Sequence, residues 1–157
     1  MQQRMKTHPL SEEKIRNLLA RAEVGVLSTI GEDGCPYCTP VHFLCEGRKF
    51  YVHGLPKGQK IENLQRNSKV GFCVYELQKY LMPDDDSPCN VNTQYESVIV
   101  TGTASMLENQ AAKAEVLKKI VAKYTPELKD RELPEAAIRG TGVIEITAAT
   151  LTGKYYE

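Results

Sequence analysis

Short segments rich in β-branched and aromatic residues follow one another through the first third of the chain, with only a few turn residues between them. The segments are residues 24–30, 37–44 and 49–53, and the turns are Gly31–Gly34 and Glu46–Gly47. Parallel strands need a crossover of a dozen or more residues, whereas a tight turn is enough for an antiparallel pair. The spacing therefore predicts an antiparallel meander and argues against a doubly wound α/β fold.

Three segments carry the apolar period of amphipathic helices. The first segment follows Ser11, which is placed to cap it, and its apolar stripe runs from Ile15 to Ala22. The other two segments cover residues 59–67 and 109–124. Further strands are expected at residues 69–75, 97–106 and 142–150, with a long polar loop at 76–94 and a flexible N-terminus at 1–9. About six strands and three helices predict a mainly β (α+β) fold, which we expect to be a small antiparallel barrel with flanking helices.

Composition limits the class of protein. The chain has 157 residues, of which 41% are hydrophobic, and 20 basic side chains balance 20 acidic ones. A single globular domain over residues 1–157 is expected at this length. Zero net charge argues against nucleic acid or an acidic membrane surface as the main partner. The sequence also lacks an apolar run of the roughly 20 residues that span a membrane, and its start lacks a signal-peptide pattern, so we expect a cytoplasmic protein.

A Cys-x-x-Cys motif, Cys35-Pro-Tyr-Cys38, is typical of thiol–disulfide oxidoreductases. In those enzymes the first cysteine lies at a helix N-terminus, but here the motif follows a turn and leads into a predicted strand. Zinc would need Cys35, Cys38, His42 and His53 to converge, and strand alternation separates Cys35 from Cys38. We therefore expect no metal site, and we regard the thiol oxidoreductase as the weaker alternative function.

A glycine-containing loop, Gly54-Leu-Pro-Lys-Gly58, separates a predicted strand from the helix that starts near Gln59 and Lys60. The spacing of a P-loop is not met. Backbone N–H groups at a helix start, together with one or two ammonium groups, nevertheless suit a single phosphate. From local chemistry alone, a phosphate site and a solvated basic helix start remain equally good interpretations.

Several segments together resemble the pyridoxamine 5′-phosphate oxidase-like, FMN-binding split barrels. Residues 26–41, with Leu-Ser-Thr, then Asp-Gly-Cys-Pro, then Thr-Pro-Val, are similar to the opening hairpin of that family. Residues 50–54 followed by 59–70 resemble its strand, loop and phosphate-binding helix, and residues 95–102 resemble a later strand. The likeness is greatest to the nitroimidazole-reductase-like branch, where a histidine ends the third strand as His53 does here.

The resemblance implies a six-stranded antiparallel split β-barrel and a homodimer that holds FMN at the subunit interface. It implies an FMN-dependent oxidoreductase that uses NAD(P)H to reduce a small, nitro-aromatic or similar acceptor, with His53 as the catalytic candidate. The cofactor-binding residues that it implies lie on two strands, a loop and a helix start: Cys38, Thr39, Pro40, Val41, His53, Gly54, Gln59, Lys60 and Ser97. The oxidases proper carry Arg-Lys where this chain has Gln59-Lys60, so oxidation of vitamin B6 is not predicted.

Two alternatives remain within the same fold. One is a non-catalytic flavin store or sensor, because flavin-binding residues are easier to identify here than an acid or a base. The other is a relative that handles the deazaflavin F420 or haem. The sequence does not distinguish between them.

Overall fold

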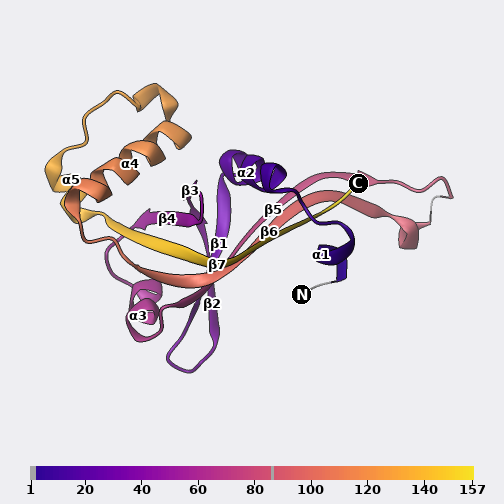
Figure 1. The fold of residues 1–157 in the computed structure, drawn as a ribbon, viewed down its shortest axis with the longest axis horizontal. Coiled ribbons are helices and arrows are strands. Elements are labelled where there is room, and N and C mark those ends of the chain that lie inside the picture. Colours follow the sequence, from indigo (N-terminus) through magenta and orange to yellow (C-terminus); the bar gives the residue numbers. More distant parts are fainter. Residues whose placement is uncertain (1–2, 86) are drawn as a thin grey trace.

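One antiparallel sheet of seven strands organises the chain, and the computed structural model describes residues 3–85 and 87–157 (Figure 1). The elements in chain order are α1 (Gln3–Thr7), α2 (Glu12–Arg21), β1 (Val24–Ile30), β2 (Pro36–His42), β3 (Leu44–Glu46), β4 (Lys49–Gly54), α3 (Gln59–Arg66), β5 (Lys69–Leu81), η1 (Pro88–Asn90), β6 (Asn92–Met106), α4 (Gln110–Tyr124), η2 (Pro126–Leu128), α5 (Glu135–Gly140) and β7 (Gly142–Tyr156).

The strand order is β2-β1-β5-β6-β7-β4-β3, so β2 and β3 form the two ends of the sheet. The sheet curls until Cα atoms of β2 and β4 come within 8 Å of each other. Across the described residues β2 pairs only with β1, and the sheet does not close into a ring. The mainly β prediction with flanking helices is confirmed. The structure has seven strands where six were expected, because the short strand β3 was not foreseen.

The β1–β2 hairpin forms where the sequence predicted it, because its turn residues suit the backbone there. Gly34 has a φ of 79°, a left-handed conformation that glycine adopts without strain. The Asp33 carboxylate accepts a hydrogen bond from the Cys35 backbone N–H at 2.9 Å. These contacts fix the register in which Val24 lies opposite His42.

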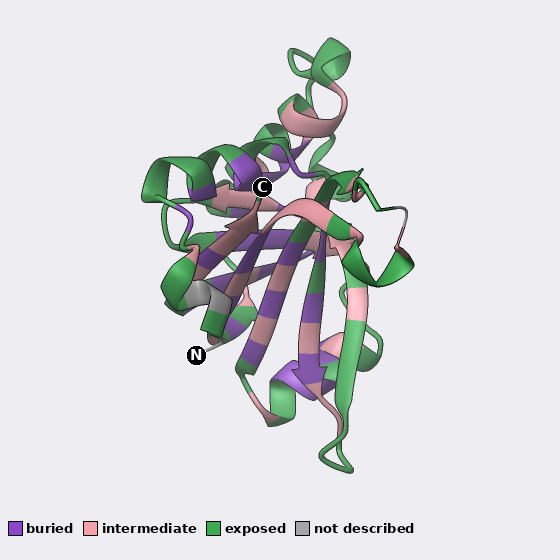
Figure 2. Cartoon of the chain, turned by 90° about the vertical axis from the view of Figure 1, so that its right-hand side faces the viewer, coloured by how far each residue is buried: buried purple, intermediate pink, exposed green. Residues whose placement is uncertain are grey.

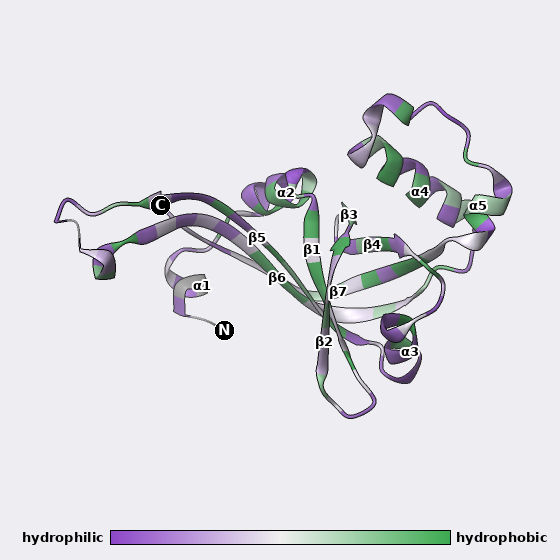
Figure 3. Ribbon diagram, turned by 180° about the vertical axis from the view of Figure 1, so that it is seen from behind, coloured by the Kyte–Doolittle hydropathy of each residue, from purple (hydrophilic) through white to green (hydrophobic). Residues whose placement is uncertain are grey.

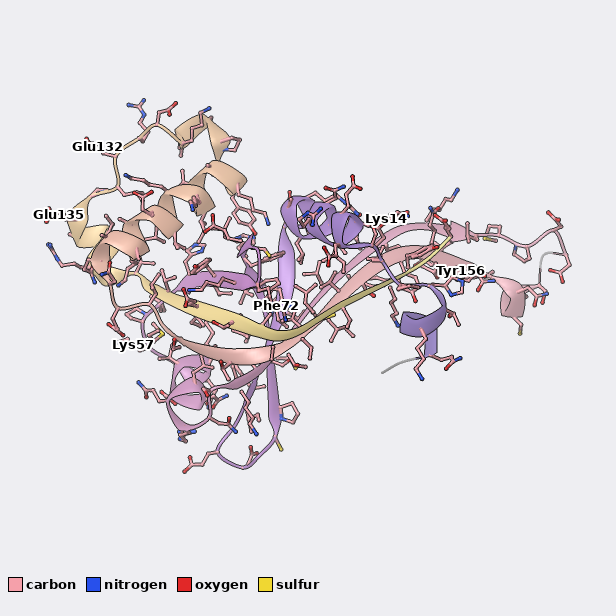
Figure 4. The ribbon with its side chains drawn as sticks, viewed as in Figure 1. Lys14, Lys57, Phe72, Glu132, Glu135 and Tyr156 are labelled. Carbon is pink, nitrogen blue, oxygen red and sulfur yellow. The ribbon has the colours of Figure 1, made fainter. Side chains whose placement is uncertain are left out.

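The main core fills the inside of the curled sheet, and α2 and α3 close it. Phe43, Phe50 and Phe72 are almost fully buried, and their ring centroids lie 5.2–6.3 Å apart. Phe72 lies at the centre of the sheet in Figure 4. Figure 2 shows buried and partly buried positions alternating along the strands, as expected for strands with one face toward a core.

A second, smaller core lies on the opposite face of β4 and β7, under α4. Tyr51 and Val143 pack there against Val116, Leu117 and Ile120 of the helix. The apolar stripe of α4 is visible as green segments in Figure 3. The helix was predicted at residues 109–124, and Asn109 caps it by accepting a hydrogen bond from the Ala112 N–H at 2.9 Å. The sheet is therefore covered on both faces near α4.

The expectation of a polar loop over residues 76–94 was too wide, because only residues 82–91 lie outside the strands. Strand β5 continues to Leu81 and β6 begins at Asn92, so most of this segment forms a long hairpin, which we call the arm (residues 75–95). Figure 1 shows the arm projecting away from the helices, with the end of β7 beside it. Apolar residues at 75 and 77 do alternate with polar ones, but the acidic and proline-rich tip obscured that strand pattern.

The two ends of the chain lie close together. Strand β7 extends to Tyr156, beyond the predicted end at residue 150, and pairs with β6 as far as Tyr95. Pro9 forms an isolated bridge with Lys154. The N-terminal segment includes the short helix α1. In residues 3–85 and 87–157, no helix has the length and apolar character needed to cross a bilayer.

Candidate functional site

The free edge of β2 is the first component of the site. Because β2 is a terminal strand, the main-chain groups on its outer edge have no partner strand among the described residues. The stretch from Cys38 to Val41 lies on this edge, and Pro40 contributes a carbonyl but no N–H. Thr39 is fixed by its own hydroxyl, which donates to the Leu27 carbonyl oxygen at 3.4 Å. The strand therefore offers main-chain donors and acceptors in a fixed row.

The start of α3 is the second component. Gly58 has a φ of 114° and no side chain to cap the helix, and the first backbone bonds to its carbonyl come from Ile61 and Glu62. The N–H groups of Gln59 and Lys60 precede the first intrahelical bonds, so they face outward as donors. Among the described residues, no carboxylate pairs with the Lys60 ammonium group. This combination suits an anion.

A chain of amides braces this helix start against the sheet. The Gln59 side chain donates to the Asn63 oxygen at 2.8 Å, and the Asn63 amide donates to the Thr29 hydroxyl at 2.9 Å. Asn63 and Thr29 are both buried. Sequence analysis did not identify Asn63, although a polar residue between the core positions Ile61 and Leu64 was a usable signal. Asn63 therefore fixes α3 to β1, and Gln59 holds the Asn63 amide in place.

A cavity of about 530 Å³ lies beside these two components, and it is bordered by the first residues of β2 and by Gln59 of α3, but not by Cys38–Val41 or Lys60. It lies between the β1–β2 turn and α3, and Tyr37, Gln59 and Asn63 line it. Its size is within the range of small-molecule sites. The carboxylates on its rim are engaged locally: Glu32 pairs with Arg66 at 3.7 Å, and the hydrogen bond from Cys35 lowers the pKa of Asp33.

His53 lies in a different cavity. Its side chain contributes to a space of about 130 Å³ under α4 and α5, together with Leu117, Ile138 and Thr141. In the described structure the buried Nδ1 atom has no hydrogen-bond partner. Burial lowers the pKa of His53, and the neighbouring His42 lowers it further, so the imidazole is neutral at pH 7.

The remaining predicted residues are distributed as follows. Gly54 ends β4 opposite Gly142. Ser97 lies in β6 at the base of the arm, buried, and within the described chain its hydroxyl has no partner. Of the predicted cofactor-binding residues, only Gln59 lines the cavity of about 530 Å³. His53 and Ser97 lie apart from it.

A latch that sequence analysis missed holds the C-terminal end of β2. The Tyr124 hydroxyl accepts a hydrogen bond from the Phe43 N–H at 2.8 Å, and its ring stacks on His42 with centroids 4.7 Å apart. The Lys123 ammonium donates to the carbonyl oxygens of Leu19 and Phe43 at 3.2 and 3.1 Å. Burial lowers the pKa of Lys123. These contacts fix α4 to the strand whose edge is free.

The Cys-x-x-Cys motif lies outside any helix. Cys35 belongs to the turn before β2, and Cys38 lies within β2 with its sulfur 3.1 Å from the Ser28 hydroxyl. Both cysteines are exposed. Over residues 3–85 and 87–157, no group of three or more metal-ligating side chains gathers. The motif therefore lacks the helix dipole that thiol oxidoreductases use to activate a cysteine.

Known structures share this architecture over most of the chain. A candidate 5-nitroimidazole antibiotic resistance protein from Bacteroides thetaiotaomicron is 26% identical with a TM-score of 0.81, over 94% of this chain and 86% of that one. An FAD- and haem-binding protein from Mycobacterium smegmatis is 18% identical with a TM-score of 0.82, over 94% and 72%. An F420 reductase is 22% identical with a TM-score of 0.57, over 87% and 94%.

A search of curated proteins finds no match. A protein-family model described as pyridoxamine 5′-phosphate oxidase matches residues 11–155. This match agrees with the resemblance seen in the opening hairpin and in the loop before α3. The chain belongs to the pyridoxamine 5′-phosphate oxidase family.

Proposed function

We propose that the protein binds FMN along the free edge of β2, with the FMN phosphate at the start of α3. The observation that carries this proposal is that the terminal strand β2 and the uncapped start of α3 border one cavity of suitable size, through Tyr37 and Gln59. Lys60 and the N–H groups of Gln59 and Lys60 would hold the phosphate. Main-chain groups of Cys38 to Val41 would hydrogen-bond the polar atoms of the flavin ring.

The proposed activity is the NAD(P)H-driven reduction of a small acceptor. Bound FMN supplies hydride and electron transfer, which no amino-acid side chain provides. The protein orients the ring through β2, which its pairing with β1 and the Tyr124 latch keep rigid. The structural likeness to a candidate nitroimidazole resistance protein supports a nitro-aromatic acceptor as the substrate class.

His53 has a narrower role in this proposal. Its imidazole is neutral at pH 7, so it can donate one hydrogen bond to an acceptor but does not neutralise a carboxylate. The cavity that it lines, about 130 Å³, is smaller than typical sites for drug-sized ligands.

We further propose that the functional unit is a homodimer. Val24 and Val26 of β1 and Tyr75 and Leu77 of β5 share one sheet face, because Val26 lies opposite Cys73 in the β1–β5 pairing. These four side chains are 37–56% exposed, although they are large and apolar. A contiguous patch of this kind marks an interaction site. The same face adjoins the free edge of β2, so a second subunit would border the flavin.

The visible absorbance spectrum tests this proposal. The purified protein, or the protein after addition of FMN, should show an oxidised-flavin spectrum that bleaches with NAD(P)H under anaerobic conditions. A flavin spectrum that resists NAD(P)H would instead indicate a store or sensor. Uptake of F420 or haem in preference to FMN, or failure to bind FMN at all, would contradict the assignment.

A further inference from the structure

A second cavity, of about 550 Å³, lies between α2 and the turn that joins β3 to β4. Its floor consists of Ile15, Leu19 and Leu151, and Cys45 closes one side. Ile15 and Leu19 are members of the main core, so the floor is rigid. The proposed flavin site lies elsewhere: Figures 1 and 3 show α2 on one side of the sheet and α3 near the other end of β1.

One guanidinium group at this cavity lacks an acidic partner. Arg48 donates through Nε and Nη2 to the Ala148 carbonyl oxygen, at 3.2 and 3.0 Å, and through Nη2 to that of Ala149 at 2.7 Å. Ala149 is the extra residue of a β7 bulge opposite Thr101 and Gly102. No ion pair involves Arg48 within residues 3–85 and 87–157. Its backbone-bound side chain is therefore held in place with its charge uncompensated.

The other charges near the cavity do not cancel that of Arg48. Glu12 pairs with Arg16 at 3.9 Å, and Glu46 is held by Lys119 of α4 at 2.6 Å. Burial raises the pKa of Cys45 to about 11, so its thiol stays neutral and adds no negative charge. The cavity thus combines an apolar floor with one net positive charge on its rim.

We infer that this cavity binds a small carboxylate with an aromatic or branched aliphatic body. The apolar part would cover Ile15, Leu19 and Leu151, and the carboxylate would meet the free Nη1 side of Arg48. A guanidinium fixed by hydrogen bonds loses little further freedom when it binds a planar carboxylate. This site is independent of the flavin and of the proposed reductase activity.

Calorimetric titration of the full-length, FMN-saturated protein with 2-naphthoate tests the inference, with neutral 2-naphthamide as the matched ligand. Saturation with FMN keeps the aromatic probe out of the flavin site. We expect one site per chain and about tenfold tighter binding of the carboxylate, the effect of a charge-assisted hydrogen bond. Equal binding of the two probes, or the absence of saturable binding, would overturn the inference.

Two variants locate the binding. Ala20 is an exposed residue of α2 that lines the cavity, so Ala20→Trp should fill it and weaken naphthoate binding by about tenfold or more. Ala122→Trp, at an exposed position of α4, is the matched control and should bind as the wild type does. Arg48→Met should remove the preference for the carboxylate over the amide. Wild-type affinity in a folded Ala20→Trp protein would place the probe elsewhere and refute the site, whatever the folding state of Arg48→Met.

Discussion

Strands β5 and β6 pass through two different environments, the body of the sheet and the arm. In the body, Phe72 and Val100 lie opposite each other and are almost fully buried. In the arm, Tyr75 and Tyr80 of the same strand β5 are 56% and 64% exposed. The backbone pairing of β5 with β6 extends through both halves, with one irregularity between Leu77 and Lys79, so hydrogen bonding alone does not explain the difference in exposure. The difference is that the chain covers its own body but leaves the large apolar residues of the arm exposed.

The largest effect should come from removing an aromatic ring from the body. We expect Phe72→Ala to lower the free energy of unfolding by about 3–5 kcal/mol, because it leaves a cavity among Phe43 and Phe50. Tyr75→Ala, its neighbour in the arm, should cost less than about 1 kcal/mol. Both variants are to be measured by urea unfolding in a chain that also carries Leu77→Asp, because this background removes the contribution of subunit association to stability. Equal costs at the two positions would contradict the division into body and arm.

The next prediction concerns association. Leu77→Asp places a charge on the exposed arm face and should raise the dimer dissociation constant at least about 30-fold, the effect of a central interface residue. Leu128→Asp is the control, because Leu128 lies outside the arm, in η2, and is about as exposed as Leu77 (46% against 42%). Analytical ultracentrifugation measures both. A dimer that tolerates Leu77→Asp but not Leu128→Asp would move the interface away from the arm.

A smaller effect is expected where the arm joins the body. Arg21 of α2 donates to Glu76 at 2.7 Å and to Glu96 at 2.6 Å, across the base of the arm. Arg21→Met should lower the free energy of unfolding by about 1 kcal/mol, since the Arg21 side chain is 43% exposed and its ion pairs are partly screened. Thermal unfolding at low and high salt checks this. The difference between variant and wild type should shrink in high salt, and an unchanged difference would show that charge is not the cause.

The smallest effect belongs to the second core of the body, where His53 faces α4. The folded pKa of His53 is lowered, so below about pH 6.5 the unfolded chain binds a proton more readily than the folded one. Stability should therefore fall as the pH drops from about 7.5 to 5.5, and His53→Gln should lose less stability over the same interval. Chemical unfolding at the two pH values measures the difference. A steeper loss in His53→Gln would reverse the sign and contradict a buried neutral imidazole.

Sequence patterns predicted the body better than the arm for a physical reason. Residues 24–30 form β1 as predicted, because alternation toward a core and the following turn both lie within a short segment. The arm was missed because its apolar residues have no core within the chain to identify them. The short strand β3 was missed because it has only three residues and depends on pairing with β4.

The candidate site divides in the same way. The loop and helix start around Gly58 and Lys60 could be predicted from local glycine and lysine positions. Pro36 and Pro40 lack ladder donors and so were a local signal that β2 lies at an edge, as it does. The neighbours of β2 could not be predicted, because strand order depends on long-range pairing such as that between β1 and β5. The family resemblance grouped His53 with Lys60 in one site. The structure turns His53 toward α4, into a cavity of its own.

The central claim is that FMN binds where the edge of β2 meets the start of α3, and fluorescence titration of FMN into the Lys60→Ala variant tests it most directly. Loss of the charge-assisted phosphate contact should raise the dissociation constant for FMN about 10- to 100-fold. Lys57→Ala, in the exposed loop before α3, is the control and should stay within about threefold of the wild type. Unchanged FMN affinity in a folded Lys60→Ala protein would contradict this account of the site.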